Sequence, residues 1–285
     1  MIALITGASS GIGEELAKYL AKRGFNLILT ARRKERLDEI KQNITKNHNI
    51  KVKTLAFDLS RKEDCFSLYN EVKKLNIDIL INNAGFGLFG RFFETDLDRE
   101  LEMIDVNIKA VHILTKLFLS DFCKRNYGYI LNTSSIAGYM AGPLMSTYYA
   151  SKNYVLQLTR AISEELRHAK IDGVYIGALC PGPVNTEFNK VAGAEFVTSG
   201  ASAAEIAEYA VKEMFKRKTV IIPQSHIKAL SVISKMVPSK VLLKSTYFAQ
   251  KARRGDPSDS TERTDIYSKS KCPPPFAVSK RQIFH

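Results

Sequence analysis

Two adjacent tyrosines, Tyr148 and Tyr149, stand just before Lys152 in the run STYYASKNYV. Side chains three and four residues apart share one face of a helix, so in a helix either tyrosine could approach the lysine. A free tyrosine has a pKa near 10, and a cation within about 4 to 6 Å lowers such a value by roughly 1 to 3 units. A tyrosine beside a lysine is therefore suited to giving a proton to a carbonyl oxygen or taking one from an alcohol. Spacing alone does not choose between the two.

A glycine-rich turn is the second candidate site. The segment TGASSGIG, residues 6–13, follows the apolar run IALIT and precedes the helical pattern EELAKYLAK. Glycines in this setting allow a tight turn and let the backbone approach a pyrophosphate, while the amides at the start of the helix face its negative charge. An ordinary turn between strand and helix accounts for one glycine but hardly for Gly7, Gly11 and Gly13 together. The turn therefore predicts a dinucleotide-binding site.

The elements around these residues indicate one α/β fold. Apolar, β-branched runs alternate with longer amphipathic stretches, which is typical of a parallel sheet with helices on both faces. We expect a single Rossmann-type, doubly wound domain over residues 1–223, with about seven parallel β-strands and long helices at 95–125 and 147–170. The expected strands are IALIT, NLILT, KVKTLAF, DILINN, YILNTSS, VYIGALCP and, at the edge, TVIIP.

The chain changes character after residue 223. Apolar residues at helical spacing, mixed with lysines and interrupted by Pro238, predict two short basic amphipathic helices over 224–254. Such helices could lie on an anionic membrane surface. Packing over the site or against a neighbouring subunit is favoured instead, because the stretch is short and broken by proline. Residues 255–285 are polar, proline-bearing and aperiodic, which predicts a disordered tail.

The composition fits a soluble globular protein: of 285 residues, 45% are apolar and 25% are charged. The four cysteines form no CxxC or Cys/His cluster, so we expect neither a metal site nor disulfides, and a reducing compartment fits. The first strand leaves no room for a signal peptide and no apolar run is long enough to span a membrane, so a cytoplasmic location is expected. The net charge of +13 favours anionic partners, among which nucleic acid ranks last because no basic run is interleaved with aromatics.

Further motifs, taken with the glycine turn, carry a family resemblance. Over roughly residues 1–222 the sequence resembles the short-chain dehydrogenase/reductase family. The resemblance implies hydride transfer between a nicotinamide cofactor and a carbonyl or secondary alcohol, and assembly as a homodimer or homotetramer. The matching motifs are Thr6-Gly7-x-x-x-Gly11-x-Gly13, Asn82-Asn83-Ala84-Gly85, Asn107, Ser135, Tyr148-x-x-x-Lys152 and Pro181-Gly182.

The resemblance also selects one of the two tyrosines. In the family a serine precedes the tyrosine by about thirteen residues, and Ser135 stands thirteen residues before Tyr148. Tyr148 is then the implied acid/base and Lys152 its cation. Ser135, in preference to the neighbouring Ser134, would hydrogen-bond the substrate oxygen. Asn107 would bind a water that links the lysine to solvent. The second tyrosine would face a packing surface or a subunit contact.

The end of the second strand bears on the choice of cofactor. NAD enzymes place a carboxylate there for the ribose hydroxyls, and NADP enzymes an arginine for the 2′-phosphate. The sequence has Arg32 and Arg33 and no acid, so NADP(H) is favoured, with Arg32 as the implied phosphate-binding residue. For Arg33, starting a solvated helix is an equally good explanation. The other implied cofactor-binding residues are Gly7, Ser9, Ser10, Gly11, Ile12, Gly13, Asp58, Asn83, Tyr148, Lys152, Val184 and Thr186.

The segment that encloses substrate in this family is apolar here. Residues 187–201 contain Phe188, Val191, Ala192, Phe196 and Val197, with no arginine or histidine, and the stretch FGLFGRFF at 86–93 adds aromatic rings. A hydrophobic carbonyl compound, such as an acyl chain, a ketone or a steroid-like molecule, is the substrate hypothesis. The alternative is a non-catalytic NADP-binding regulator or membrane-surface protein on the same fold. It is disfavoured because the acid/base tyrosine and its lysine are both present.

Overall fold

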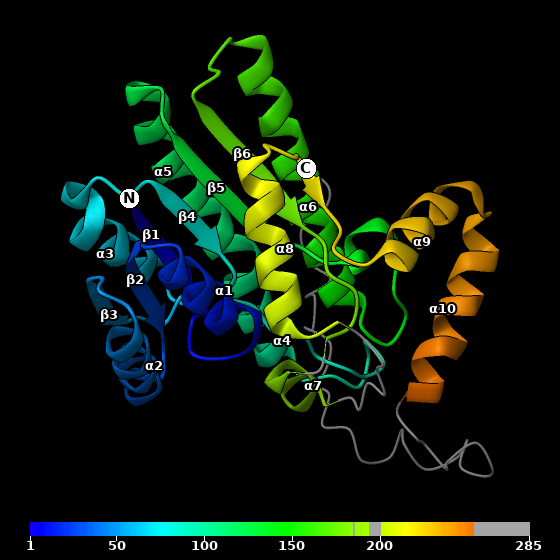
Figure 1. Cartoon of the computed structure of the whole chain (residues 1–285). Helices are drawn as coiled ribbons and strands as arrows, with labels where there is room; N and C mark the ends of the chain where they lie inside the picture. The colour runs from blue at the N-terminus through cyan, green and yellow to red at the C-terminus, as the bar shows by residue number, and fades with distance from the viewer. Residues whose placement is uncertain (185, 194–200, 254–285) are drawn as a thin grey trace, which may run out of the picture. The chain divides into compact units, whose positions relative to one another are not determined.

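A seven-stranded parallel sheet organises the protein, whose computed structural model describes residues 1–184, 186–193 and 201–253 (Figure 1). The strand order is β3-β2-β1-β4-β5-β6-β7, so the chain winds outward from β1 in one direction and then resumes on its other side at β4. All seven expected strands are confirmed. Their bounds are β1 Ile2–Thr6, β2 Asn26–Ala31, β3 Val52–Ala56, β4 Ile79–Asn82, β5 Gly128–Thr133, β6 Val174–Leu179 and β7 Val220–Ile221.

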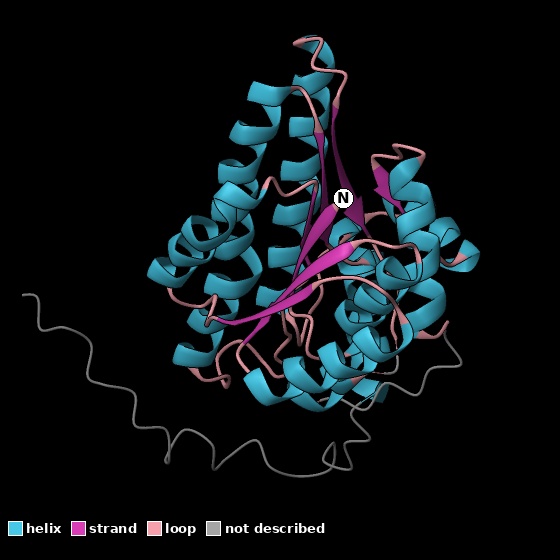
Figure 2. Cartoon of the chain, turned by 60° about the vertical axis from the view of Figure 1, so that its left-hand side comes forward, coloured by secondary structure: helices cyan, strands magenta, loops and turns pink. Residues whose placement is uncertain are grey.

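Helices cover both faces of the sheet (Figure 2). Successive strand residues point to opposite faces, so Ile5 of β1 packs with α1, α2 and α8, whereas its neighbour Leu4 packs with α3, α5 and α6. This two-sided burial explains why the strands are nearly continuous apolar runs. The helices are α1 Gly11–Lys22, α2 Lys34–Asn47, α3 Lys62–Val72, α4 Leu97–Ile104, α5 Val111–Arg125, α6 Ser146–His168, α7 Glu187–Ala192, α8 Ala203–Phe215, α9 Ser225–Met236 and α10 Ser239–Arg253.

The helix expected over 95–125 is interrupted, and in this respect the sequence-based prediction is wrong. A π-helical turn, Asp105–Ala110, separates α4 from α5. Asn107, at its centre, is fully buried and binds the backbone of Phe86 with both ends of its amide, at 3.0 Å through Oδ1 and 2.9 Å through Nδ2. A π turn widens a helix locally and often marks a functional site. The wide turn here brings a polar side chain against the loop that follows β4.

Two asparagines at the ends of neighbouring strands tie the sheet to the helices on one face. Asn82 of β4 and Asn132 of β5 are paired in register, and their side chains hydrogen-bond at 2.9 Å. Asn82 also donates to Thr115 of α5, and Asn132 donates to Thr159 of α6, at 3.1 and 3.0 Å. These buried bonds fix where α5 and α6 lie relative to the strand ends.

A core substitution tests this packing. Phe118 of α5 is almost completely buried and packs edge-on against Tyr69 of α3, with 5.3 Å between ring centroids. We expect Phe118→Ala to lower the free energy of unfolding by about 3 to 5 kcal/mol, because it removes a buried ring and leaves a cavity. Phe66 of α3 is 39% exposed, so Phe66→Ala should cost roughly 1 kcal/mol or less. Denaturant titration followed by circular dichroism measures both, and equal losses would contradict the packing described.

Candidate active site

A cavity of about 710 Å³ lies at the carboxyl ends of the strands. Ligands of open α/β sheets bind at this edge, at the point where the strand order reverses, which here lies between β1 and β4. Most of the residues that the sequence singled out line this cavity: Gly7, Ser9, Ser10, Gly11, Ile12, Arg32, Asp58, Asn83, Ser135, Tyr148, Lys152, Val184 and Thr186. The two that do not, Gly13 and Asn107, lie behind the lining and support it.

The glycine turn is packed so tightly that Gly7 and Gly13 could not carry side chains. Gly7 has a φ of +64°, and a Cβ on it would lie 2.7 Å from the Cα of Ala84. A Cβ on Gly13 would overlap the carbonyl oxygen of Gly7. The Asn83 amide nitrogen donates to the carbonyls of Thr6 and Gly7, at 3.2 and 3.3 Å, and so ties the turn to the end of β4. The backbone at the start of α1 is therefore held open to the cavity, as an anion-binding turn requires.

Two other lining positions are held by local contacts. The Asp58 carboxylate accepts hydrogen bonds from the Ser60 amide and hydroxyl, at 3.1 and 2.8 Å, which fixes it beside the cavity after β3. Thr186 lies opposite the glycine turn, where a Cβ on Gly11 would stand 3.3 Å from its side chain. The turn after β1 and the segment after β6 thus face each other across this part of the cavity.

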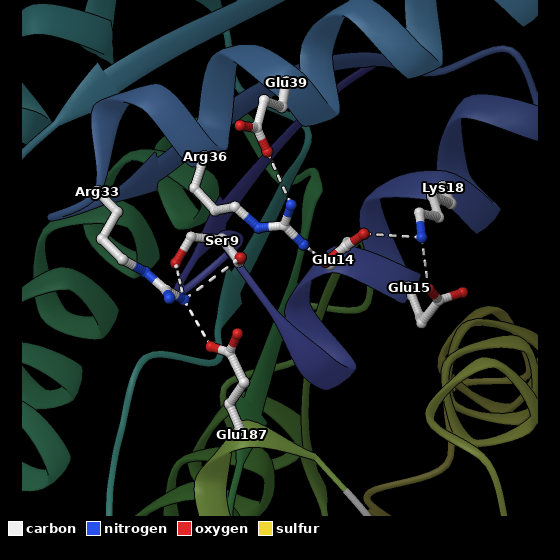
Figure 3. Close-up of polar contacts among 8 residues, drawn as sticks. All are labelled: Ser9, Glu14, Glu15, Lys18, Arg33, Arg36, Glu39 and Glu187. Atoms are coloured by element: carbon white, nitrogen blue, oxygen red, sulfur yellow. Dashed lines mark hydrogen bonds and ion pairs between the residues drawn. The ribbon is translucent and has the colours of Figure 1, made fainter. Parts of the chain in front are cut away.

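The two arginines after β2 make different contacts. Arg32 pairs with Glu102 of α4 at 2.8 Å. The Arg33 guanidinium lies 3.2 Å from the Ser9 hydroxyl and 2.8 Å from the Glu187 carboxylate (Figure 3). Arg33 holds the pKa of Glu187 below its ordinary value through this hydrogen bond. Both arginines line the cavity, and Arg33, whose role had two equally good explanations, is the one that contacts the glycine turn.

The acid/base candidates converge on the same cavity from β5 and α6. The Ser135 side chain lies close enough to that of Tyr148 to lower the tyrosine's pKa, and its hydroxyl donates to the Pro181 carbonyl at 3.5 Å. Ser135 also accepts from the Ala137 amide at 3.1 Å, which orients its hydroxyl. Ser134, the competing serine, is buried and donates to the Lys152 carbonyl at 2.7 Å, so its hydroxyl is already used. The geometry therefore brings Ser135, and not its neighbour, to the tyrosine.

Lys152 is a buried cation held by a backbone carbonyl. It is 4% exposed, and its Nζ donates to the Thr133 carbonyl at 2.9 Å. Nζ stands 5.8 Å from the centroid of the Tyr148 ring. A Cβ on Gly85 would lie 2.8 Å from Oδ1 of Asn107 and 3.3 Å from Nζ of Lys152, so this glycine makes room for both groups. Asn107 also donates to the Ser151 hydroxyl at 3.1 Å, which joins the π-helical turn to α6.

Burial shifts the pKa values of the tyrosine and the lysine in opposite directions. Burial raises the pKa of Tyr148 above its ordinary value, and the hydrogen bond with Ser135 offsets only part of this. Burial lowers the pKa of Lys152 to about 8. The expectation that Lys152 brings the tyrosine's pKa below 10 is therefore wrong for the protein's own groups, because loss of solvation outweighs the distant ammonium. The tyrosine remains protonated near neutral pH.

Helices α9 and α10 form one wall of the cavity. The sequence alone did not determine where these helices lie. Ile227 and Leu230 of α9 and Leu242 and Gln250 of α10 line it. Gln250 donates from Nε2 to the hydroxyl of Tyr149 at 2.6 Å, so the second tyrosine contacts the C-terminal helix. The favoured interpretation, packing over the site, is confirmed. The amphipathic pattern of this segment was visible in the sequence, but its position was not.

The outward side of the same helices exposes apolar residues. Ile233 of α9 and Val241 and Phe248 of α10 are each more than half exposed. Contact with a membrane surface therefore stays a prediction. Within residues 1–184, 186–193 and 201–253, no helix combines the length and the apolar character needed to cross a membrane.

The apolar segments expected around the substrate are only partly at the cavity. Phe188 of α7 lines it, with its ring 5.4 Å from that of Tyr148, and Phe86 also lines it. Phe92 and Phe93 do not line the cavity and are 66% and 80% exposed, so they are not core residues, and their place near its mouth stays a prediction. Phe196, Val197 and the tail at 255–285 lie outside the described residues, as does the side chain of Val191.

Comparisons with known proteins agree with this geometry. The sequence profile of the short chain dehydrogenase family matches residues 1–195. A very-long-chain 3-oxoacyl-CoA reductase of Anas platyrhynchos is 35% identical over 199 residues, which cover 68% of this chain but only 63% of that protein. An uncharacterized oxidoreductase of Staphylococcus saprophyticus is 34% identical over 216 residues, covering 74% of this chain and 91% of the relative.

A solved structure extends the similarity to the whole fold. The short-chain dehydrogenase from Sphingobium yanoikuyae in complex with NADPH superimposes with a TM-score of 0.76, at 29% identity, over 93% of this chain and 98% of that one. Because the family profile covers more than half of the sequence, and a relative of similar length exceeds 30% identity, this chain belongs to the short-chain dehydrogenase family of oxidoreductases.

Proposed function

We propose that this protein is an NADP(H)-dependent oxidoreductase that interconverts a carbonyl group and a secondary alcohol on a hydrophobic substrate. The observation that carries the proposal is the meeting of Tyr148, Ser135 and Lys152 at one wall of the cavity that the glycine turn also lines. A purely regulatory NADP-binding protein would not need a protonated tyrosine beside a serine and a buried lysine at this place.

The residues at the cavity suit a phosphorylated dinucleotide. The turn from Gly7 to Gly11, which lines the cavity and is backed by Gly13, would receive the pyrophosphate. Asp58 would meet the adenine, Asn83 would contact the cofactor, and Val184 and Thr186 would meet the nicotinamide side, as the family resemblance implies. Nicotinamide, when bound, would supply or accept the hydride. No carboxylate stands at the end of β2, and Arg32 and Arg33 both line the cavity there, which favours the 2′-phosphate of NADP(H).

The raised pKa of Tyr148 suits the reductive direction. A phenol that stays protonated near neutral pH can give its proton to the oxygen of a carbonyl that is being reduced. Ser135, oriented by the Ala137 amide, would hold that oxygen by a hydrogen bond. Lys152, in its charged form, would favour the tyrosinate that remains. Asn107 would position this lysine through the wide turn behind Gly85.

The remaining wall of the cavity suits an apolar substrate. Met140, Met145 and Phe188 lie on one side, and Ile227 and Leu242 on the other. No arginine or histidine of the described residues lines this end, so a charged group on the part of the substrate beyond Lys152 would lack a partner. The similarity to a very-long-chain 3-oxoacyl-CoA reductase also supports a substrate with an acyl chain.

Separate tyrosine variants test the assignment of the acid. We expect Tyr148→Phe to lower kcat for NADPH-dependent reduction of medium-chain 2-ketones by about 10²- to 10⁴-fold, because it removes the proton donor. NADPH binding, measured by fluorescence titration, should persist. The matched control Tyr149→Phe alters the neighbouring ring and should retain reduction. Turnover in Tyr148→Phe comparable to the wild-type rate would refute the assignment.

The pH dependence tests the lysine. Its pKa is depressed to about 8, so the cation is present below that pH and is lost as the pH rises through it. We expect NADPH binding to the Tyr148→Phe variant to weaken as the pH passes 8, because an uncharged Lys152 no longer attracts the anionic cofactor. Fluorescence titrations on either side of this pH measure the effect. Adding Lys152→Met should remove the transition, and an unchanged transition would assign it to another group.

Arginine variants test the cofactor preference. Arg32→Gln and Arg33→Gln should each lower the ratio of kcat/KM for NADPH to that for NADH, together by roughly ten- to hundredfold, because a charge-assisted bond to the 2′-phosphate is lost. Arg36 pairs with Glu39 and Glu14 away from the cavity (Figure 3), so Arg36→Gln is the matched control and should leave the ratio unchanged.

The ion pair of Arg33 with Glu187 allows a variant with the opposite expected effect. Glu187→Gln frees the guanidinium from a competing carboxylate, and the affinity for NADPH should rise, by up to about fivefold for so exposed a pair. Ratios that do not move in any arginine variant would argue against NADP(H) selectivity at this end of the cavity.

A further inference from the structure

The cavity wall formed by α10 contains one buried polar atom without a partner. Gln250 is 1% exposed and lines the cavity, and its Nε2 donates to the Tyr149 hydroxyl at 2.6 Å. Its other amide atom, Oε1, has no hydrogen-bond partner among the described residues. A buried amide oxygen in this state is unfavourable unless a ligand or a water molecule satisfies it.

Docking α10 onto the domain accounts for Nε2 of this amide, which bonds Tyr149, but not for Oε1. Leu242 and Ala249 of the same helix face the cavity with apolar side chains, and an apolar residue at position 250 would pack there without an unsatisfied oxygen. The hydroxyls of Ser245 and Thr246, which also line the cavity, both donate to the Leu242 carbonyl, at 2.9 and 2.7 Å. Among the described side chains of this wall, Oε1 of Gln250 is thus the buried polar atom that lacks a partner.

The position of this acceptor relates it to the reacting centre. Tyr149, which holds Gln250, packs its ring edge-on against that of Tyr148, with 6.1 Å between centroids and 79° between planes. Gly142 lies against the Tyr149 ring so closely that a Cβ there would overlap it, which keeps the ring in place. Gln250 is therefore linked through the side chain of Tyr149 to the ring of Tyr148, whose hydroxyl would protonate the substrate.

We propose that Oε1 of Gln250 is a specificity-determining acceptor for a second polar group on the substrate. The ligand class is an apolar carbonyl compound that carries a hydrogen-bond donor, a hydroxyl or a secondary amide N–H, several bonds from the carbonyl. This inference rests on the proposed reductase function. It adds a second polar group on the substrate that the otherwise apolar end of the cavity would recognise. The two contacts would also orient the substrate, because its carbonyl would face Tyr148 while its hydrogen-bond donor faces Gln250 of α10.

Matched ketones test the proposal. NADPH-dependent reduction is measured for a series of ω-hydroxy 2-ketones of increasing chain length, each beside the ω-methoxy ketone and the unsubstituted 2-ketone of the same length. A parallel series carries a secondary amide in place of the hydroxyl, which distinguishes the two kinds of donor. We expect kcat/KM for one spacing of a donor-bearing ketone to exceed that of its methoxy partner by about three- to tenfold, as one neutral hydrogen bond allows. The advantage should lie mainly in KM.

Variants then assign the preference to the amide. Gln250→Leu should abolish the donor advantage while reduction of the unsubstituted ketone continues, and Tyr149→Phe, which releases the amide, should weaken it. Phe248→Gln changes an exposed residue of the same helix and is the matched control, in which the advantage should be intact. A purely structural role for Gln250 predicts an equal loss for all three kinds of ketone.

The outcomes separate this inference from the proposed function. If the wild-type protein reduces the ketones with no donor preference at any spacing, or if the methoxy compounds gain equally, the role of Gln250 is refuted and the reductase stands. If the preference survives Gln250→Leu, another group recognises the donor and the inference is again overturned. If no ketone in any series is reduced, the proposed function fails and the inference fails with it.

Discussion

The site depends on burying one ammonium group without a counter-ion. Among the described residues no carboxylate pairs with Lys152, and its Nζ is held by the carbonyl of Thr133 at the end of β5. Burial of an unpaired cation is costly and lowers its pKa, here to about 8. The fold tolerates this because Gly85 leaves space beside the ammonium and because the amide of Asn107 stands on the far side of that space. A lysine whose pKa lies near the ambient pH gains or loses its proton readily when a charge appears beside it.

The surrounding architecture follows from that requirement. Parallel strands end at the same edge, so the loop after β4, the carbonyls of β5 and the first turns of α6 reach one place. The π-helical turn between α4 and α5 lets Asn107 bind both the Phe86 backbone and Ser151 of α6, which an uninterrupted helix would not present in this way. The asparagines of β4 and β5 fix α5 and α6 to the strand ends. Each of these devices restrains the position of the lysine or of the tyrosine one turn before it.

The sequence predicts the parts of this arrangement that depend on residues close together in the chain. Strands, the glycine turn and the Tyr148-to-Lys152 spacing each depend on a few neighbouring residues, so all seven strands and most of the predicted site residues could be found before the structure. The π-helical turn could not, because its central side chain, Asn107, bonds the Phe86 peptide, which is distant in sequence. Arg33 and Glu187 meet across the glycine turn through tertiary packing alone. The pKa of Tyr148 also escaped prediction, since it is set by burial and not by spacing.

The two walls of the cavity have different roles in the proposed reaction: one holds the reacting groups, and the other contacts the rest of the substrate. The wall built from β4, β5 and α6 holds the proposed proton donor, its serine and its cation, and shifting any of these by even 1 Å would disturb proton transfer. The wall built from α9 and α10 holds no group of the proposed reaction and meets the other through side-chain contacts such as that between Gln250 and Tyr149. Side chains on that wall that do not touch Tyr149 can therefore change without moving the reacting groups. Under the proposed function, the choice of substrate would then depend mainly on α9 and α10, and the reaction on the strand ends.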